Sequence, residues 1–199
     1  MKSRSFSQLL VCLVLLAGLL LSACGETPRP TAGSIDLPTP QTSTGPAQEN
    51  LNITPPSGPV RIVPGATAPD FAVTDITGQP IKLSDHRGKA VIINYWSIYC
   101  DYCREEMPEL VKTYQANRDK LNVIGIDIND EPAEVKDFVR QLNITYPIVI
   151  DNTGDMVYKY RVLGRPTSIF INKEGVITGV VPGIVTPPVL EEQLKRVLK

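Results

Sequence analysis

The chain has 199 residues, a formal net charge of −1 at pH 7 and 42% hydrophobic residues. This nearly neutral balance gives no electrostatic case for binding nucleic acid or an anionic lipid surface. Cysteine is the informative residue type: Cys12 and Cys24 lie near the N-terminus, and Cys100 and Cys103 lie together in the middle of the chain. Because His86 is the one histidine in the sequence, the ligands for a zinc site are too few, and we expect no metal.

Residues 1–23 are predicted to be a lipoprotein signal peptide. Lys2 and Arg4 supply a positive start, and residues 9–21 form an almost unbroken apolar stretch. This stretch is shorter than the roughly 20 residues that a membrane-spanning helix needs. The Leu-Ser-Ala-Cys that ends at Cys24 resembles the bacterial lipobox, so we expect Cys24 to carry the lipid and to anchor the protein to the bilayer, most simply at the outer face of the cytoplasmic membrane. The alternative is an ordinary secretory signal in which Cys24 is incidental.

Residues 25–60 are rich in Pro, Thr and Ser and show neither a helical nor a strand period. Such a composition cannot bury enough apolar surface to offset the entropy lost on ordering. We therefore expect a signal peptide over residues 1–23, a lipidated Cys24 with its tether over 24–60, and one folded domain over 61–199.

The folded part is predicted to open with a β-hairpin. Residues 69–75 and 80–83 each alternate between apolar and polar side chains, and Thr77-Gly78 separates them. Residues 90–96 then form a continuous run of apolar, β-branched and aromatic side chains with one Asn. Such a run is typical of a central strand that is buried on both faces.

Cys100 and Cys103 follow this strand and open a helical pattern that reaches about residue 118. The order strand, turn, helix places Cys100 at a helix N-terminus, where unpaired N–H groups and the macrodipole favour a thiolate. Cys103 can then resolve the mixed disulfide that Cys100 makes. A structural bridge is the weaker hypothesis, because so short a loop would stabilise little. The pair is itself the redox centre, and no further cofactor is expected.

The rest of the chain continues as strands and helices. The predicted segments are a strand at 121–128, a helix from Pro132 to Leu142, a strand at 146–150, a short helix at 155–160, a hairpin made of 167–172 and 176–181, and a last helix from about Pro187. Strands that alternate with helices and end in a hairpin and a helix predict an α/β fold with a mixed sheet.

Several motifs resemble those of the TlpA/ResA-like thioredoxins. They are Ala-Pro-Asp-Phe at 68–71, Leu-Ser-Asp at 83–85 with Gly-Lys at 88–89, Tyr-Trp-Ser-Ile-Tyr-Cys-Asp-Tyr-Cys-Arg-Glu-Glu-Met-Pro at 95–108 and Gly-Arg-Pro-Thr at 164–167. The resemblance covers 61–199 and implies a thioredoxin fold, a mixed central sheet flanked by helices, with an N-terminal hairpin and a βα insertion. It also implies a membrane-tethered thiol–disulfide oxidoreductase that reduces client disulfides, such as that of apocytochrome c, with electrons from a membrane donor.

The resemblance also assigns roles to single residues. It agrees with the strand–helix junction on Cys100 as the attacking nucleophile and Cys103 as the resolving thiol. It implies that Pro166 is a cis-proline beside the disulfide and that Arg165 lies on a substrate-facing loop. The residues expected to contact the client are Trp96, Tyr99, Arg165 and Pro166.

Glu106 is the candidate proton carrier for Cys103. It lies three residues further along the helix and so shares a face with Cys103. The resemblance implies a glutamate here that lies near the disulfide and influences thiol acidity. Thioredoxin has a buried aspartate at the position that Asn94 occupies here, and Asn94 cannot titrate. If proton transfer to Cys103 needs a carboxylate, Glu106 is therefore the candidate. The alternative is that Glu106 forms an ion pair with a nearby arginine on the helix surface. Glu105 points elsewhere and is expected to be solvated.

Other functions fit parts of this pattern. A general thiol reductase for another exported client would use the same cysteines, and a scaffold lipoprotein with a vestigial pair would show no exchange. A peroxiredoxin would need a Pro-x-x-x-Thr-x-x-Cys environment, whereas residues 95–97 are Tyr-Trp-Ser. A Sco-like copper-binding module would need a wider cysteine spacing and a late histidine, and no histidine follows His86.

Overall fold

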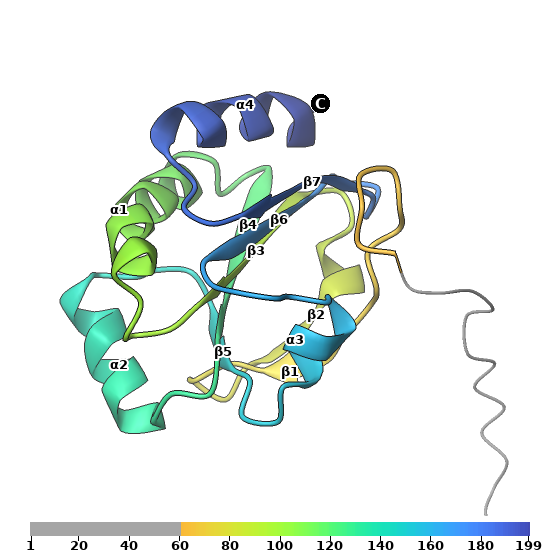
Figure 1. Cartoon of the computed structure of the whole chain (residues 1–199). Helices are drawn as coiled ribbons and strands as arrows, with labels where there is room; N and C mark the ends of the chain where they lie inside the picture. The colour runs from red at the N-terminus through yellow and green to blue at the C-terminus, as the bar shows by residue number, and fades with distance from the viewer. Residues whose placement is uncertain (1–60) are drawn as a thin grey trace, which may run out of the picture. The chain divides into compact units, whose positions relative to one another are not determined.

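The computed structural model describes residues 61–199, and a five-stranded mixed sheet forms its centre (Figure 1). The predicted signal peptide, Cys24 and tether lie outside the described residues. The strand order is β5-β4-β3-β6-β7, in which β4 and β5 run parallel to β3, and β6 and β7 continue the sheet in antiparallel pairings. The strands are β3 at Ala90–Trp96, β4 at Leu121–Asp127, β5 at Ile148–Ile150, β6 at Thr167–Ile171 and β7 at Ile177–Pro182.

Helices cover one face of the sheet, and a hairpin with a short helix covers the other (Figure 1). The first layer contains α1 at Asp101–Ala116, α2 at Pro132–Gln141 and α4 at Pro187–Val197. The second contains the hairpin of β1 at Ala72–Thr74 and β2 at Pro80–Lys82, the 3-10 helix η1 at Leu83–His86, and α3 at Asp155–Lys159. This arrangement is a thioredoxin fold, and the predicted fold class is confirmed.

The strand β3 divides the core into two apolar clusters. Its seven residues are all buried, and successive side chains of a strand point to opposite faces. Ile92 and Trp96 join the cluster under α1, α2 and α4, whereas Val91, Ile93 and Tyr95 join the cluster under the hairpin and α3. Burial on both faces explains why the sequence of this strand is a continuous apolar run.

Differences from the predicted boundaries are small and have local causes. The helix α1 begins at Asp101, because Cys100, where the helical pattern was predicted to open, acts as its N-cap. The strand β5 begins at Ile148 instead of Tyr146, after Pro147, which has no N–H to donate to a ladder.

The strand directions bring the functional segments to one edge of the sheet. β3 and β4 are parallel, so Trp96 and Asp127 are register partners at their carboxyl ends. β6 is antiparallel to β3, so its first residue Thr167 pairs with Tyr95 at the same edge. The Cys100 loop, the end of β4 and the Pro166 loop therefore lie together. Among residues 61–199, no helix is long and apolar enough to cross a membrane.

Candidate active site

Cys100 and Cys103 form a disulfide at the N-terminus of α1. Cys100 has an extended backbone and is the N-cap of the helix, and its Sγ accepts a hydrogen bond from the N–H of Cys103 at 3.2 Å. In the reduced protein the same N–H and the positive end of the helix would face a Cys100 thiolate. Both interactions favour the charged form of the sulfur, which is the reactive form.

The two sulfurs differ in exposure. The side chain of Cys103 is 0% exposed and belongs to the apolar cluster under α1, whereas Cys100 is half-buried at the edge of that cluster. An incoming disulfide can therefore approach Cys100, while Cys103 stays behind it. This asymmetry is what the assigned order of attack requires.

Glu106 is buried on α1, one turn after Cys103. Its side chain is 3% exposed, its Oε1 accepts a hydrogen bond from Asn94 Nδ2 at 2.7 Å, and its Oε2 accepts one from the N–H of Val185 at 2.6 Å. Burial raises the pKa of this carboxyl, and the hydrogen bonds from Val185 and Asn94 offset part of that rise. The surface ion pair considered as an alternative is wrong, while Glu105 is exposed as expected.

Asn94 connects Glu106 to the strand that follows the Pro166 loop. Its amide nitrogen also donates to Ser168 Oγ at 3.0 Å, and both side chains are 0% exposed. The amide oxygen of Asn94 is buried and has no hydrogen-bond partner among residues 61–199. If the amide turns, that oxygen can accept a hydrogen bond from the protonated carboxyl of Glu106, so Asn94 can pair with either protonation state of Glu106.

Arg165 and Pro166 lie on the loop that leads into β6. The peptide bond between them is cis, as the resemblance implied, and Pro166 is buried while Arg165 is exposed. The loop is held by the N–H of Gly183, which donates to the carbonyl of Pro166 at 2.8 Å, and by Thr167 Oγ1, which donates to the carbonyl of Gly164 at 2.8 Å. Arg165 is thus available to a client at the edge where Cys100 lies.

The two aromatic residues predicted to contact the client have different surroundings. Tyr99 is 71% exposed beside Cys100, and its hydroxyl donates to Glu134 Oε2 at 2.7 Å, which raises the pKa of the phenol. Trp96 is 0% exposed and stacks on Phe138 with 5.3 Å between the ring centroids. A client cannot reach Trp96, so its predicted role in substrate binding is wrong. The alternation along β3 directs this side chain into the core.

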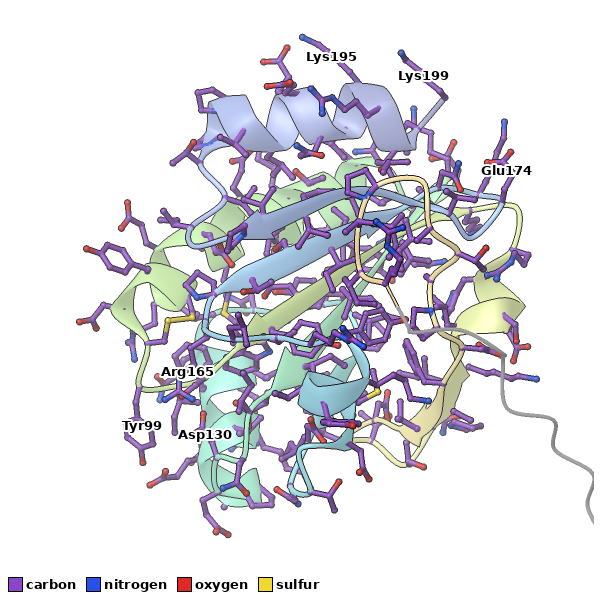
Figure 2. All side chains as sticks on the ribbon, turned by 45° about the vertical axis from the view of Figure 1, so that its right-hand side comes forward. Tyr99, Asp130, Arg165, Glu174, Lys195 and Lys199 are labelled. Atoms are coloured by element: carbon purple, nitrogen blue, oxygen red, sulfur yellow. A yellow bond between two sulfur atoms is a disulfide. The ribbon has the colours of Figure 1, made fainter. Side chains whose placement is uncertain are left out.

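Two carboxyl groups at the end of β4 are part of this edge and were not predicted. Asp127 is 0% exposed at the last position of β4, and Asp130 follows in the loop before α2. Asp130 Oδ2 accepts the N–H of Ile98 at 2.7 Å, and Asp130 Oδ1 accepts the hydroxyl of Ser97 at 3.2 Å. Figure 2 shows Asp130 together with Tyr99 and Arg165 at this end of the molecule. The sequence feature that could have identified this part of the site is Asp127, an acidic residue at the end of a mostly apolar buried strand.

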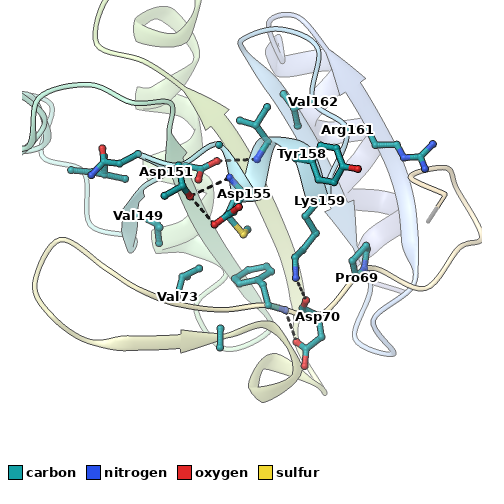
Figure 3. Close-up of a pocket in the computed structure, with 18 of the residues that line it drawn as sticks. Pro69, Asp70, Val73, Val149, Asp151, Asp155, Tyr158, Lys159, Arg161 and Val162 are labelled. Carbon is teal, nitrogen blue, oxygen red and sulfur yellow. Dashed lines mark hydrogen bonds between the residues drawn. The ribbon is translucent and has the colours of Figure 1, made fainter. Parts of the chain in front are cut away.

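A separate groove lies between the hairpin and α3 (Figure 3). Its lining includes Val73, Asp151 and Lys159, and the ammonium of Lys159 donates to the carbonyl of Asp70 at 3.0 Å. The groove contains none of the predicted site residues. Within the described domain, no group of three or more His, Cys, Asp or Glu side chains could hold a metal ion.

A cysteine pair at a helix N-terminus, with one sulfur accessible and one buried, carries out thiol–disulfide exchange. On this fold the pair defines a thiol–disulfide oxidoreductase, and the protein is an enzyme of this class.

Comparison with known proteins gives the family. Residues 64–180 match the AhpC/TSA family. The thiol-disulfide oxidoreductase ResA of Bacillus thuringiensis subsp. konkukian is 37% identical over 134 residues, which are 67% of this chain and 78% of the relative. A thiol:disulfide interchange protein of Chlorobium tepidum has a TM-score of 0.63 at 26% identity, over 71% of this chain and all of that one. The exposed lipoprotein thioredoxin Etrx1 of Streptococcus pneumoniae has a TM-score of 0.58 at 26% identity, over 64% of this chain and 98% of that one. The chain belongs to the AhpC/TSA family and, with its curated relatives, to the ResA-like thiol–disulfide oxidoreductases.

Proposed function

We propose that this protein is held by a lipid on Cys24 at the outer face of the cytoplasmic membrane and reduces disulfides in exported client proteins there. The observation that carries the exchange role is the unequal exposure of the two sulfurs, Cys100 half-buried and Cys103 at 0%. The reducing direction is supported by the resemblance to TlpA/ResA-like proteins. It supports a two-step exchange in which the client meets Cys100 alone.

The chemistry balances as a two-electron exchange. The Cys100 thiolate attacks one client sulfur, a mixed disulfide forms, and the other client sulfur leaves as a thiolate that takes up a proton. Cys103 then passes its proton to the Glu106 carboxylate and attacks the sulfur of Cys100. The client leaves as a dithiol, and the enzyme is left with the Cys100–Cys103 disulfide. A reduced membrane donor must return two electrons before the next cycle.

Apocytochrome c is the first candidate client. Its haem-attachment motif is a Cys-x-x-Cys-His whose thiols must be free before haem is attached, so an oxidised motif is a substrate for this chemistry. The resemblance to TlpA/ResA-like proteins, which implies cytochrome c maturation, supports this client. The Leu-Ser-Ala-Cys motif and the similarity to a lipoprotein thioredoxin support the anchor.

Trapping of the mixed disulfide tests the roles and identifies the client. Cys103→Ser should accumulate client adducts on Cys100, because the resolving step is removed, and Cys100→Ser should accumulate few. Adducts are separated on non-reducing gels of membrane extracts and identified by mass spectrometry. More adducts with Cys100→Ser than with Cys103→Ser would show that the assignment is reversed. Adducts that lack apocytochrome c but contain another exported protein would favour the general thiol reductase.

A peroxidase is the second candidate, because the family match is to AhpC/TSA. Three residues before Cys100 the chain has Ser97, which is buried and donates its hydroxyl to Asp130. Rapid oxidation of the reduced pair by hydrogen peroxide, compared with its oxidation by a disulfide peptide, separates the two functions. We expect the peptide to react faster.

A further inference from the structure

The loop that carries Cys100 is fastened by a single carboxylate. Asp130 accepts the N–H of Ile98 and the hydroxyl of Ser97, and Ser97 Oγ in turn accepts the N–H of Tyr99 at 3.2 Å. The carbonyl of Ser97 accepts the N–H of Cys100 at 3.2 Å. Any displacement of the Asp130 side chain therefore reaches the backbone of the nucleophile within two hydrogen bonds.

Asp127 lies directly against Asp130. Its Oδ1 accepts the backbone N–H of Asp130 at 3.0 Å, which holds the two acidic residues next to one another. The Oδ2 of Asp127 is buried and has no donor in the described part of the chain. Two carboxylates cannot hydrogen-bond to one another, because neither has a proton to donate. A proton on Asp127 turns the contact into a hydrogen bond to Asp130 and satisfies the buried oxygen.

The charged and titratable groups around the pair come from four elements. They are Arg165 from the cis-proline loop, Tyr99 from the Cys100 loop, Glu134 from α2, and Asp151, whose N–H donates to the Asp127 carbonyl from the end of β5. Within residues 61–199, Arg165 is the one cation whose charge lowers the pKa of Asp127, and it is exposed. An exposed guanidinium is too well solvated to hold the buried carboxylate of Asp127 beside the half-buried carboxylate of Asp130.

We propose that Asp127 and Asp130 share one proton and act as positioning residues, which hold the loop from Ser97 to Tyr99 so that Cys100 is presented to a client. Loss of the shared proton would place two negative charges in contact beneath the loop. Asp130 would move away and release Ile98 and Ser97. The rate of exchange through Cys100 would then fall at alkaline pH. This fall would be separate from any effect of the titration of the cysteines or of Glu106. The inference depends on the thiol–disulfide activity alone and not on the client proposed above.

The pH range of this change follows from the site. Burial is the largest cause that raises the pKa of the Asp127 carboxyl to about 8, followed by the side chain and the charge of Asp130. The backbone N–H of Asp130 and, less strongly, the charge of Arg165 oppose this rise. The shared proton is thus present at neutral pH and is lost as the pH rises through 8. A cysteine at its usual pKa becomes more reactive over the same range, so the two effects have opposite signs.

Infrared difference spectra of the oxidised full-length protein detect the proton directly, because the cysteines do not titrate as a disulfide. The Glu106→Gln background removes the buried carboxyl beside Cys103. We expect a carboxylic-acid C=O band at pH 6.5 that disappears with a midpoint near pH 8 and is missing when Asp127→Asn is added. If Glu106→Gln protein shows no such band, the proposal is overturned.

Exchange kinetics with a disulfide peptide test the effect on Cys100. Asp127→Asn keeps a donor toward Asp130 at every pH, so its rate relative to wild type should rise by about tenfold between pH 6.5 and 9.5, the scale expected for a small misplacement of a reacting group. Asp130→Asn keeps an acceptor for Ile98 and removes the second charge, and should likewise abolish the alkaline fall.

Asp137→Asn is the matched control, since Asp137 is exposed on α2 and pairs with Arg140. Its profile should match that of wild type. If both variants fold, profiles that coincide with wild type in both would overturn the proposal. If one variant folds poorly, a profile of the other that coincides with wild type would overturn it.

Discussion

At the scale of single residues, the site contains two buried acidic residues, Glu106 and Asp127, whose contacts differ. Glu106 accepts from Asn94 and Val185 beneath Cys103, whereas Asp127 lies under the loop before Cys100. Each is buried, and burial raises both pKa values because it disfavours the charged form. Glu106 can therefore serve the resolving thiol while Asp127 and Asp130 serve the nucleophile.

Glu106→Gln tests the first of these roles. The glutamine fits the same space, and its amide can pair with the free oxygen of Asn94, so we expect the fold to remain intact. Glu106→Gln removes a negative carboxylate near the cysteines, so a thiolate forms there more easily. The pH profile of alkylation of the reduced pair should therefore shift to lower pH. Loss of the proton acceptor should slow peptide exchange by about 10²-fold, the lower end of the range for general acid–base catalysis.

Stability gives an independent readout of the same variant, with a definite sign. The folded-state pKa of Glu106 lies above its ordinary value of 4.5, so its contribution is complete below pH 4.5 and is lost as the pH rises through the raised value. The free energy of unfolding of oxidised wild type should therefore fall with pH relative to Glu106→Gln. Glu105→Gln is the control, because Glu105 is exposed. Superimposed alkylation and exchange profiles for wild type and Glu106→Gln would contradict the role.

At the scale of secondary structure, the sequence predicts the helices and strands that hydrophobic periodicity and helix-start or turn residues mark. The buried runs identify β3 and β4, the spacing of Val135 and Phe138 identifies the buried face of α2, and Pro132 marks its first turn. The pairing of Asp127 with Asp130 was not predicted, because a turn after β4 brings the two residues together and hydrophobic periodicity does not reveal such a turn. Trp96 was expected to contact the client, although the apolar run that ends with it already predicted a strand buried on both faces.

The close fit of β4 to its neighbours leads to a prediction at Gly125. A Cβ there would lie 2.5 Å from Ile148 Cδ1 and 3.0 Å from Trp96 Nε1, both in the buried cluster under the helices. Gly125→Ala should lower the free energy of unfolding by about 1–3 kcal/mol, as expected for overpacking of a core. Denaturant unfolding measures it, with Gly164→Ala as control because nothing lies within 4 Å of a Cβ there. Equal midpoints for Gly125→Ala and wild type would show that Ile148 moves aside at no cost.

At the scale of the whole molecule, the sequence predicts three parts, and the described domain over 61–199 is the part that performs exchange. In the proposed function its edge with Cys100 meets clients and a membrane donor, so the proposed anchor at Cys24 would determine where the chemistry takes place. Stable anchoring needs two acyl chains, because a single chain binds a bilayer only marginally. A lipidated Cys24 with two or three chains would meet that requirement without a membrane-spanning helix.

Cys24→Ala tests the anchor and leaves the redox site untouched. We expect the variant to move from the membrane fraction to the soluble fraction, while exchange with a disulfide peptide in solution stays at the wild-type rate. Mass spectrometry of the wild-type protein should find a diacylated or triacylated Cys24 as the mature N-terminus. Maturation of a membrane-bound client should fall in cells with Cys24→Ala, because the enzyme is no longer concentrated beside its donor. An unmodified mature terminus at any other residue would contradict the lipoprotein assignment, and the domain would then act as a freely secreted reductase.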